Sequence, residues 1–147
     1  MATVSTYLNF QGNTEEAFNF YKSVFKTEFY GPAMRFKDIP PMQGMRPIPE
    51  SEENNIMHIM LPTLGGHNLM GTDASESMGH KVQFGNNIHI NLEPDTIEEG
   101  QRLFDALSEG GKVEMPYQKQ FWGDTFGSLT DRFGVKWMVN VSGQGQQ

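Results

Sequence analysis

Two stretches of this sequence repeat each other: Leu8-Asn9-Phe10 followed by residues 15–21, and Ile90-Asn91-Leu92 followed by residues 98–104. Each stretch has a strand-like triplet and then an acidic, helix-like segment. A second pair of similar segments closes the copies, residues 66–70 matching residues 134–138. Two long copies exclude a solenoid, which stacks several short repeats. The sequence therefore predicts a duplicated α+β module, with a ligand site expected where the copies meet.

Composition narrows the function classes. The 147 residues carry a net charge of −7 and an isoelectric point near 5.0, which disfavours nucleic-acid and anionic-membrane partners. The absence of cysteine excludes disulfides, thiolate metal ligands and cysteine nucleophiles. No apolar run approaches the roughly 20 residues of a membrane helix, and the first ten residues lack the features of a signal peptide. The expected location is the cytoplasm.

The same order of elements is predicted in both halves. In the first half, strands are expected at 4–10, 28–36, 56–61 and 67–72, with a helix over 14–25 capped by Asn13 or Thr14. In the second half, strands are expected at 87–92, 112–115, 126–130 and 136–141, with a helix from Asp95 or Thr96 to about Ser108. Residues 1–147 are thus interpreted as one domain, with modules at about 3–73 and 86–142 and a linker at 74–85.

Two segments fall outside this pattern. Residues 37–55 contain four prolines and form no predicted element, and such a long loop is typical of a lid, a binding loop or disorder. Residues 117–123 form an aromatic loop containing Tyr117, Phe121 and Trp122, which either lines a ligand site or closes a sheet edge or dimer contact. Residues 144–147 are expected to be a frayed tail.

Strand alternation separates an apolar face from a polar one in each predicted sheet. Leu8, Phe10, Ile90 and Leu92 fall on the side that should pack on a helix. The opposite side is rich in Tyr, Asn, His, Thr and Met but poor in Lys and Glu, which favours a cavity or an interface over a solvated surface. The predicted ligand-binding residues are Tyr7, Asn9, His58, Met70, Thr72, His89, Asn91, Trp122, Met138 and Asn140.

Several motifs together resemble the PhnB-like branch of the vicinal oxygen chelate superfamily, which includes glyoxalase I, bleomycin-resistance proteins and extradiol dioxygenases. They are Tyr7-Leu8-Asn9-Phe10, residues 58–61, Phe121-Trp122-Gly123 and residues 130–140. The resemblance implies two βαβββ modules forming a curled mixed sheet around a cavity, and a homodimer. Members of this branch often carry the label demethylubiquinone methyltransferase, but no glycine-rich methyl-donor motif follows a strand here.

The resemblance also implies four metal-ligand positions, one on the first and one on the last strand of each module. In this sequence they hold Ser5, Met70, Asn87 and Met138. Serine and asparagine are weak ligands and thioethers prefer Cu(I), so we expect no divalent metal at these positions and no firmly bound cofactor. A non-standard site could use His58, His89 and Asp73, whose imidazoles and carboxylate suit Zn²⁺ or Fe²⁺. In the alternative interpretation the histidines are hydrogen-bonded or line a pocket, and Asp73 caps the turn after its strand.

Three functional hypotheses remain open at this point. The protein binds a small molecule without catalysis, it is a metal-dependent lyase, isomerase or dioxygenase with a rearranged site, or it is mainly a structural homodimer. The first is preferred because the implied metal positions lack good ligands. A small-molecule ligand and a second copy of the chain are therefore the expected partners.

Overall fold

The computed structural model describes residues 1–40, 43–44 and 46–143, and they form two compact units, residues 1–83 and 84–147. Residues 41, 42 and 45 of the proline-rich segment and the predicted tail at 144–147 lie outside the described residues. Each unit contains one helix and one four-stranded sheet, which confirms the predicted α+β class. In the described part of the chain, no helix is long and apolar enough to cross a bilayer.

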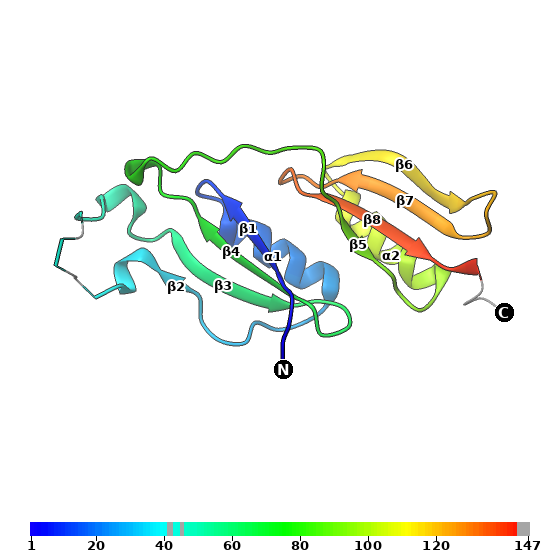
Figure 1. Ribbon diagram of the computed structural model, residues 1–147, viewed down its shortest axis with the longest axis horizontal. Coiled ribbons are helices and arrows are strands. Elements are labelled where there is room, and N and C mark those ends of the chain that lie inside the picture. The colour runs from blue at the N-terminus through cyan, green and yellow to red at the C-terminus, as the bar shows by residue number, and fades with distance from the viewer. Residues whose placement is uncertain (41–42, 45, 144–147) are drawn as a thin grey trace. The chain divides into compact units, whose positions relative to one another are not determined.

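The first unit contains β1 (Thr6–Phe10), α1 (Thr14–Phe25), β2 (Met34–Arg35), β3 (Ile56–Pro62) and β4 (Asn68–Asp73). Its sheet has the order β1-β4-β3-β2 (Figure 1). β1 runs parallel to β4, and the other pairs are antiparallel. The first strand therefore lies beside the last strand of its own unit.

The second unit repeats this topology with β5 (Ile90–Leu92), α2 (Ile97–Ser108), β6 (Lys112–Lys119), β7 (Thr125–Thr130) and β8 (Lys136–Val141). The strand order is β5-β8-β7-β6, and β5 is parallel to β8. The prediction of two βαβββ modules is confirmed. Each module forms its own open four-stranded sheet, and the cavity expected from the resemblance stays a prediction.

Local sequence signals explain both helices. Glu15 and Glu16 occupy the first turn of α1, where carboxylates interact favourably with the helix dipole. α1 ends where Lys26 adopts a left-handed conformation (φ 55°). The Thr96 hydroxyl caps α2 by accepting a hydrogen bond from the Glu99 amide at 3.1 Å, as predicted.

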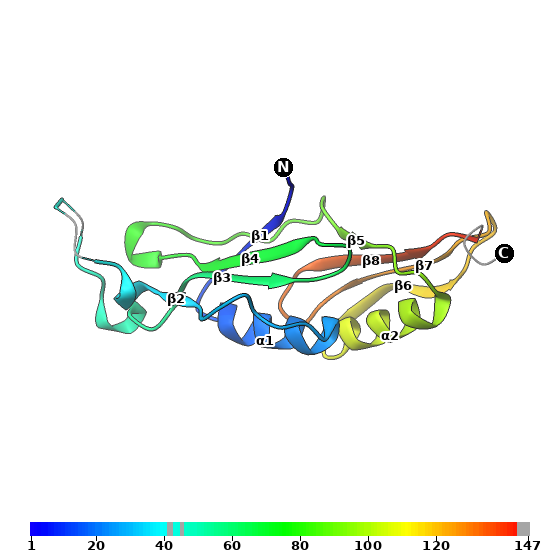
Figure 2. The ribbon, with the colours of Figure 1, turned by 90° about the horizontal axis from the view of Figure 1, so that it is seen from below.

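One face of each sheet packs closely on its helix, and Figure 2 shows the helix of each unit on one side of its strands. A Cβ built on Gly71 of β4 would lie 2.5 Å from the Phe18 ring of α1, and one on Gly127 of β7 would lie 2.7 Å from the Phe104 ring of α2. Glycine thus lets the helix approach the sheet backbone in both units. The covered faces hold the core, which includes Phe10, Phe18, Tyr21, Leu61, Leu69, Leu103, Leu107, Leu129, Trp137 and Val139.

Several predicted boundaries were wrong. β2 comprises two residues instead of the predicted 28–36, because Gly31 and Pro32 interrupt that stretch. β6 continues to Lys119, so Tyr117 lies in a strand and not in the aromatic loop. β1 and β5 begin at Thr6 and Ile90, so Val4 and Ile88 precede them and are exposed.

The close approach of α1 to the sheet predicts the effect of a single methyl group. Gly71→Ala should lower the free energy of unfolding by about 1–3 kcal/mol, because the new methyl overpacks the Phe18 ring. Urea unfolding of the full chain, followed by circular dichroism, measures the change. Gly31→Ala is the control, since its Cβ would meet nothing within 4 Å; it should leave stability unchanged or raise it by up to about 1 kcal/mol. Equal effects of the two substitutions would contradict the packing.

Candidate functional site

The face of the first sheet opposite α1 brings together five of the predicted ligand-binding residues. We call it the first open face. It is formed by alternate side chains of β1, β2, β3 and β4, and we define it by the seven at its centre, Tyr7, Asn9, Met34, His58, Met60, Met70 and Thr72. The paired residues Pro62 and Asn68 continue the same face beyond Met60 and Met70. These side chains are half-buried or exposed, whereas the intervening residues Leu61, Leu69 and Gly71 are buried.

Strand register fixes the neighbours on this face. Tyr7 lies opposite Met70, and Met70 lies opposite Met60 on the other side. The ring centroids of Tyr7 and His58 are 6.1 Å apart, with the planes tilted by 40°. Two thioethers and two polar aromatic rings therefore form a continuous surface that can pack on an organic molecule.

The pKa of the Tyr7 side chain on this face is shifted. Partial burial raises the pKa of its phenol, and a hydrogen bond from the Thr72 side chain partly opposes this effect. As for an ordinary tyrosine, the phenol is protonated at neutral pH and can donate a hydrogen bond. The first open face carries no Lys, Arg, Asp or Glu side chain among the seven residues that define it.

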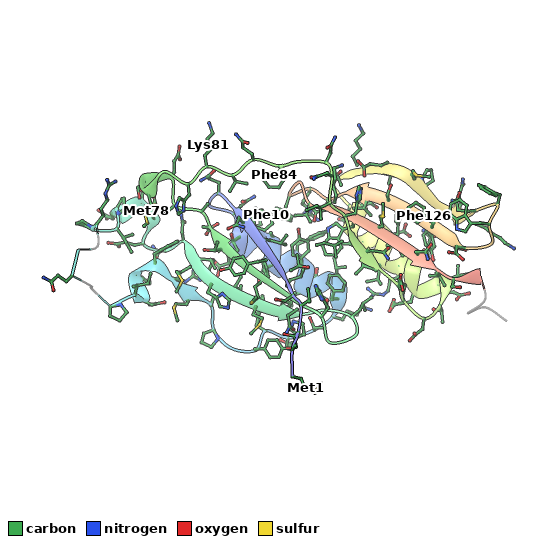
Figure 3. The ribbon with its side chains drawn as sticks, viewed as in Figure 1. Met1, Phe10, Met78, Lys81, Phe84 and Phe126 are labelled. Atoms are coloured by element: carbon green, nitrogen blue, oxygen red, sulfur yellow. The ribbon has the colours of Figure 1, made fainter. Side chains whose placement is uncertain are left out.

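The corresponding face of the second sheet holds the other predicted residues of the strands. Asn91 lies opposite Met138, which lies opposite Ser128. Asn140 lies opposite Phe126, which Figure 3 labels. The Asn91 amide donates to Glu93 at 3.0 Å, and the Asn140 amide donates to Asp124 at 3.3 Å. These two amides are thus already engaged within the unit.

His89 joins a charged cluster on the second sheet. Glu114 accepts hydrogen bonds from Lys136 Nζ at 2.5 Å and from the Thr130 hydroxyl at 3.3 Å, and His89 Nε2 lies 3.5 Å from its other oxygen. Lys136 is the main reason that the pKa of Glu114 is lowered. The carboxylate beside His89 is therefore ionised, and the Lys136 ammonium group balances its charge. A carboxylate paired in this way is poorly suited to bind a metal cation as well.

Asp73 has a structural role in the first unit. Its Oδ1 accepts from the Gly12 amide (2.9 Å), the Thr14 amide (3.0 Å) and the Thr14 hydroxyl (2.6 Å), and its Oδ2 accepts from the Ile56 amide (2.8 Å). A carboxylate offers about four acceptor positions, so these donors use its capacity. Asp73 is 2 % exposed and alternates away from the first open face, whereas His58 lies on it. It joins β4 to the starts of α1 and β3 instead of facing a ligand.

The donor set at the four positions implied by the resemblance does not fit a hard divalent metal. Met70 and Met138 lie on the open faces, and their thioethers are soft ligands. Ser5 and Asn87 precede β1 and β5 and are exposed. Among residues 1–40, 43–44 and 46–143, no group of three His, Asp or Glu side chains is placed to hold a metal ion.

Trp122 lies on the turn between β6 and β7, beside Phe126 of the second sheet. The centroid of its ring lies 5.0 Å from that of Phe121, in an edge-on arrangement, and 6.5 Å from that of Phe126. Phe121 is 98 % exposed and Trp122 52 %. The aromatic residues thus form an exposed surface on this turn, and the homodimer stays a prediction.

Comparison with known proteins places these features in a family. The model of the family described as 3-demethylubiquinone-9 3-methyltransferase matches residues 2–140. The chain belongs to this family. It is 32 % identical to protein YjdN of Escherichia coli over 147 residues, with 94 % of each chain covered.

Solved structures support the same assignment. Protein PA1353 from Pseudomonas aeruginosa is 35 % identical with a TM-score of 0.81, covering 97 % of this chain and 98 % of its own. The PhnB protein from Bacillus cereus, named a putative 3-demethylubiquinone-9 3-methyltransferase, is 27 % identical with a TM-score of 0.73, covering 96 % and 100 %. A glyoxalase/bleomycin resistance protein/dioxygenase family enzyme from Burkholderia phytofirmans shares the fold at 17 % identity, with a TM-score of 0.60 and coverage of 92 % and 96 %. The chain is thus similar to the PhnB protein, and it shares the fold of a glyoxalase/bleomycin resistance protein/dioxygenase family enzyme.

Sequence reasoning missed three contributors to these sites. Met34 extends the first open face because β2 pairs it with His58. Glu114 and Lys136 meet across β6, β7 and β8, and only the strand register reveals that contact. Alternation within β8 places Lys136 and Met138 on one face, and this was the available signal for the lysine.

The contacts of Asp73 predict that its charge stabilises the first unit. Asp73→Asn should lower the free energy of unfolding by about 2–3 kcal/mol, because an amide cannot accept from all four donors. Chemical denaturation of the full chain checks this value. Asp38→Asn is the matched control, since Asp38 is exposed and accepts from the Arg35 amide; its cost should stay below about 1 kcal/mol. An Asp73→Asn variant as stable as the natural protein would contradict the structural role.

Proposed function

We propose that the protein binds a small uncharged organic molecule on the first open face, without a divalent metal at the family positions. The observation that carries this proposal is the composition of that face. Its seven residues present aromatic, thioether, hydroxyl, amide and imidazole groups, and they include no Lys, Arg, Asp or Glu. Binding sites for small molecules combine apolar surface with a few polar groups in the same way.

The chemistry of these groups indicates the kind of ligand. The Tyr7 phenol, which like any tyrosine with a pKa of about 10 is protonated at neutral pH, is a hydrogen-bond donor. His58 and Thr72 add further polar groups, while Met60 and Met70 favour flat or apolar ligand surface. A net charge of −7 repels anions at long range. An uncharged aromatic molecule with a hydrogen-bond acceptor meets all of these conditions.

Methyl transfer, which the family's description mentions, has little support in this geometry. It would need a site for a methyl donor, and donors with anionic groups commonly use free amides at a helix N-terminus. In this chain the Gly12 and Thr14 amides at the start of α1 already donate to Asp73. We therefore propose ligand binding in preference to methyl transfer.

The metal-dependent alternative was predicted at His58, His89 and Asp73. Of these, His89 lies near a further carboxylate, that of Glu114. Their separation of 3.5 Å would allow both to reach one ion. However, Lys136 binds the same carboxylate, and a metal would have to displace that ammonium group. Asp73, the predicted carboxylate ligand, already accepts from donors at the starts of α1 and β3. Binding without a metal is the simpler proposal.

A fragment-binding experiment tests the proposal. Acetophenone, a neutral aromatic ketone, is titrated into full-length protein carrying ¹³C-labelled methionine methyl groups. We expect saturable shifts of the Met60 and Met70 methyl signals, and weaker binding of benzoate, which is similar in size but anionic. Tyr7→Leu should weaken acetophenone binding by about tenfold, because it removes a ring contact and a hydrogen-bond donor.

Tyr30→Leu provides the matched control for this experiment. Tyr30 is an exposed tyrosine of the same unit, and its hydroxyl donates to Asn68 at 2.9 Å. This variant should bind acetophenone within about twofold of the natural protein. Absence of saturable shifts at Met60 and Met70, or equal effects of the two tyrosine substitutions, would overturn the proposal.

A further inference from the structure

A small cavity in the first unit involves none of the residues of the first open face. It lies between the proline-rich segment and the turn that follows β4, and its apolar lining consists of Phe36, Pro47, Ile48 and Met78. Met78, labelled in Figure 3, belongs to the 3₁₀ turn Glu76–Met78. The cavity offers about 60 Å³, enough for about four to six water molecules.

Glu52 provides a fixed negative charge in this cavity. Its Oε1 accepts from the Ser75 hydroxyl at 2.6 Å and from the Ser77 hydroxyl at 3.0 Å, and its Oε2 accepts from the Ser77 amide at 3.2 Å. These bonds, that from Ser75 first, lower the pKa of Glu52. They also hold the 3₁₀ turn Glu50–Glu52 against the turn after β4. Oε2 keeps capacity for one more donor.

Arg46, an exposed residue that also lines the cavity, provides the opposite charge. Among the described residues, no hydrogen bond or ion pair engages its guanidinium, whereas Arg35 is paired with Glu15 and Arg102 with Glu99. Arg46 and Glu52 thus line one cavity without forming an ion pair with each other. A guanidinium that is not already paired can bind a carboxylate through two parallel hydrogen bonds.

We propose that this cavity binds a zwitterionic α-amino acid with an apolar side chain. The ligand carboxylate binds Arg46, its ammonium group binds Glu52, and its side chain extends out of the cavity onto Met78, which is 54 % exposed. An anion alone would be repelled by Glu52 and a cation alone by Arg46, whereas a zwitterion satisfies both. This second site is independent of the ligand proposed for the first open face.

Three related probes test the site in full-length protein with ¹³C-labelled methionine methyl groups. L-leucine carries both charges, 4-methylpentanoate lacks the ammonium group, and 3-methylbutylamine lacks the carboxylate. We expect L-leucine to produce a saturable shift of the Met78 methyl signal, and each analogue to bind at least about tenfold more weakly. The methyl signals of Met60 and Met70 should not move, since they belong to the first open face.

Charge substitutions provide a second, independent measurement. Arg46→Gln and Glu52→Gln should each weaken L-leucine binding by about tenfold. The matched controls are Lys37→Gln and Glu50→Gln, which alter exposed charges in the same region that do not line the cavity; they should remain within about twofold. The proposal is overturned if L-leucine causes no saturable shift at Met78, if either analogue binds as tightly, or if Arg46→Gln has no effect.

Discussion

One helix can cover only one face of a four-stranded sheet. In both units this constraint determines which side chains of the sheet are left uncovered by the helix. The rings of Phe18 and Phe104 fill the space that Gly71 and Gly127 leave open, so the helix-facing side is close-packed. Every second side chain of each strand then lies on the other side. Because both units have the same βαβββ order, each has one sheet face that its helix does not cover, built from corresponding strands.

The two open faces have nevertheless diverged. The first has no Lys, Arg, Asp or Glu among the seven residues that define it and centres on Tyr7, whereas the second has Glu114 between Lys136 and His89. Duplication preserved the backbone, because the strand pairing is the same in both units. The side chains exposed by that backbone were free to change. Membership of the family therefore specifies the fold, while the ligand is determined by the residues on each face.

Local signals made much of the fold predictable. The predicted helix at 14–25 coincides with α1, because helical spacing and acidic residues near the N-terminus act within a few residues. β6 was predicted too short because Pro116 resembles a strand end; as an edge strand, β6 tolerates it. For candidate residues within strands, such as His58 and Met70, the face of the sheet followed from the alternation of side chains. The role of Asp73 did not, because its partners Gly12 and Ile56 are distant in sequence.

This chain keeps the superfamily fold, and the residues at the implied metal positions do not suit a hard metal. Inductively coupled plasma mass spectrometry of the purified full-length protein tests this mismatch most directly. The soft or weak ligands at Ser5, Met70, Asn87 and Met138 predict far less than one divalent metal ion per chain. One tightly held divalent ion per chain, retained through dialysis against a chelator, would contradict the account.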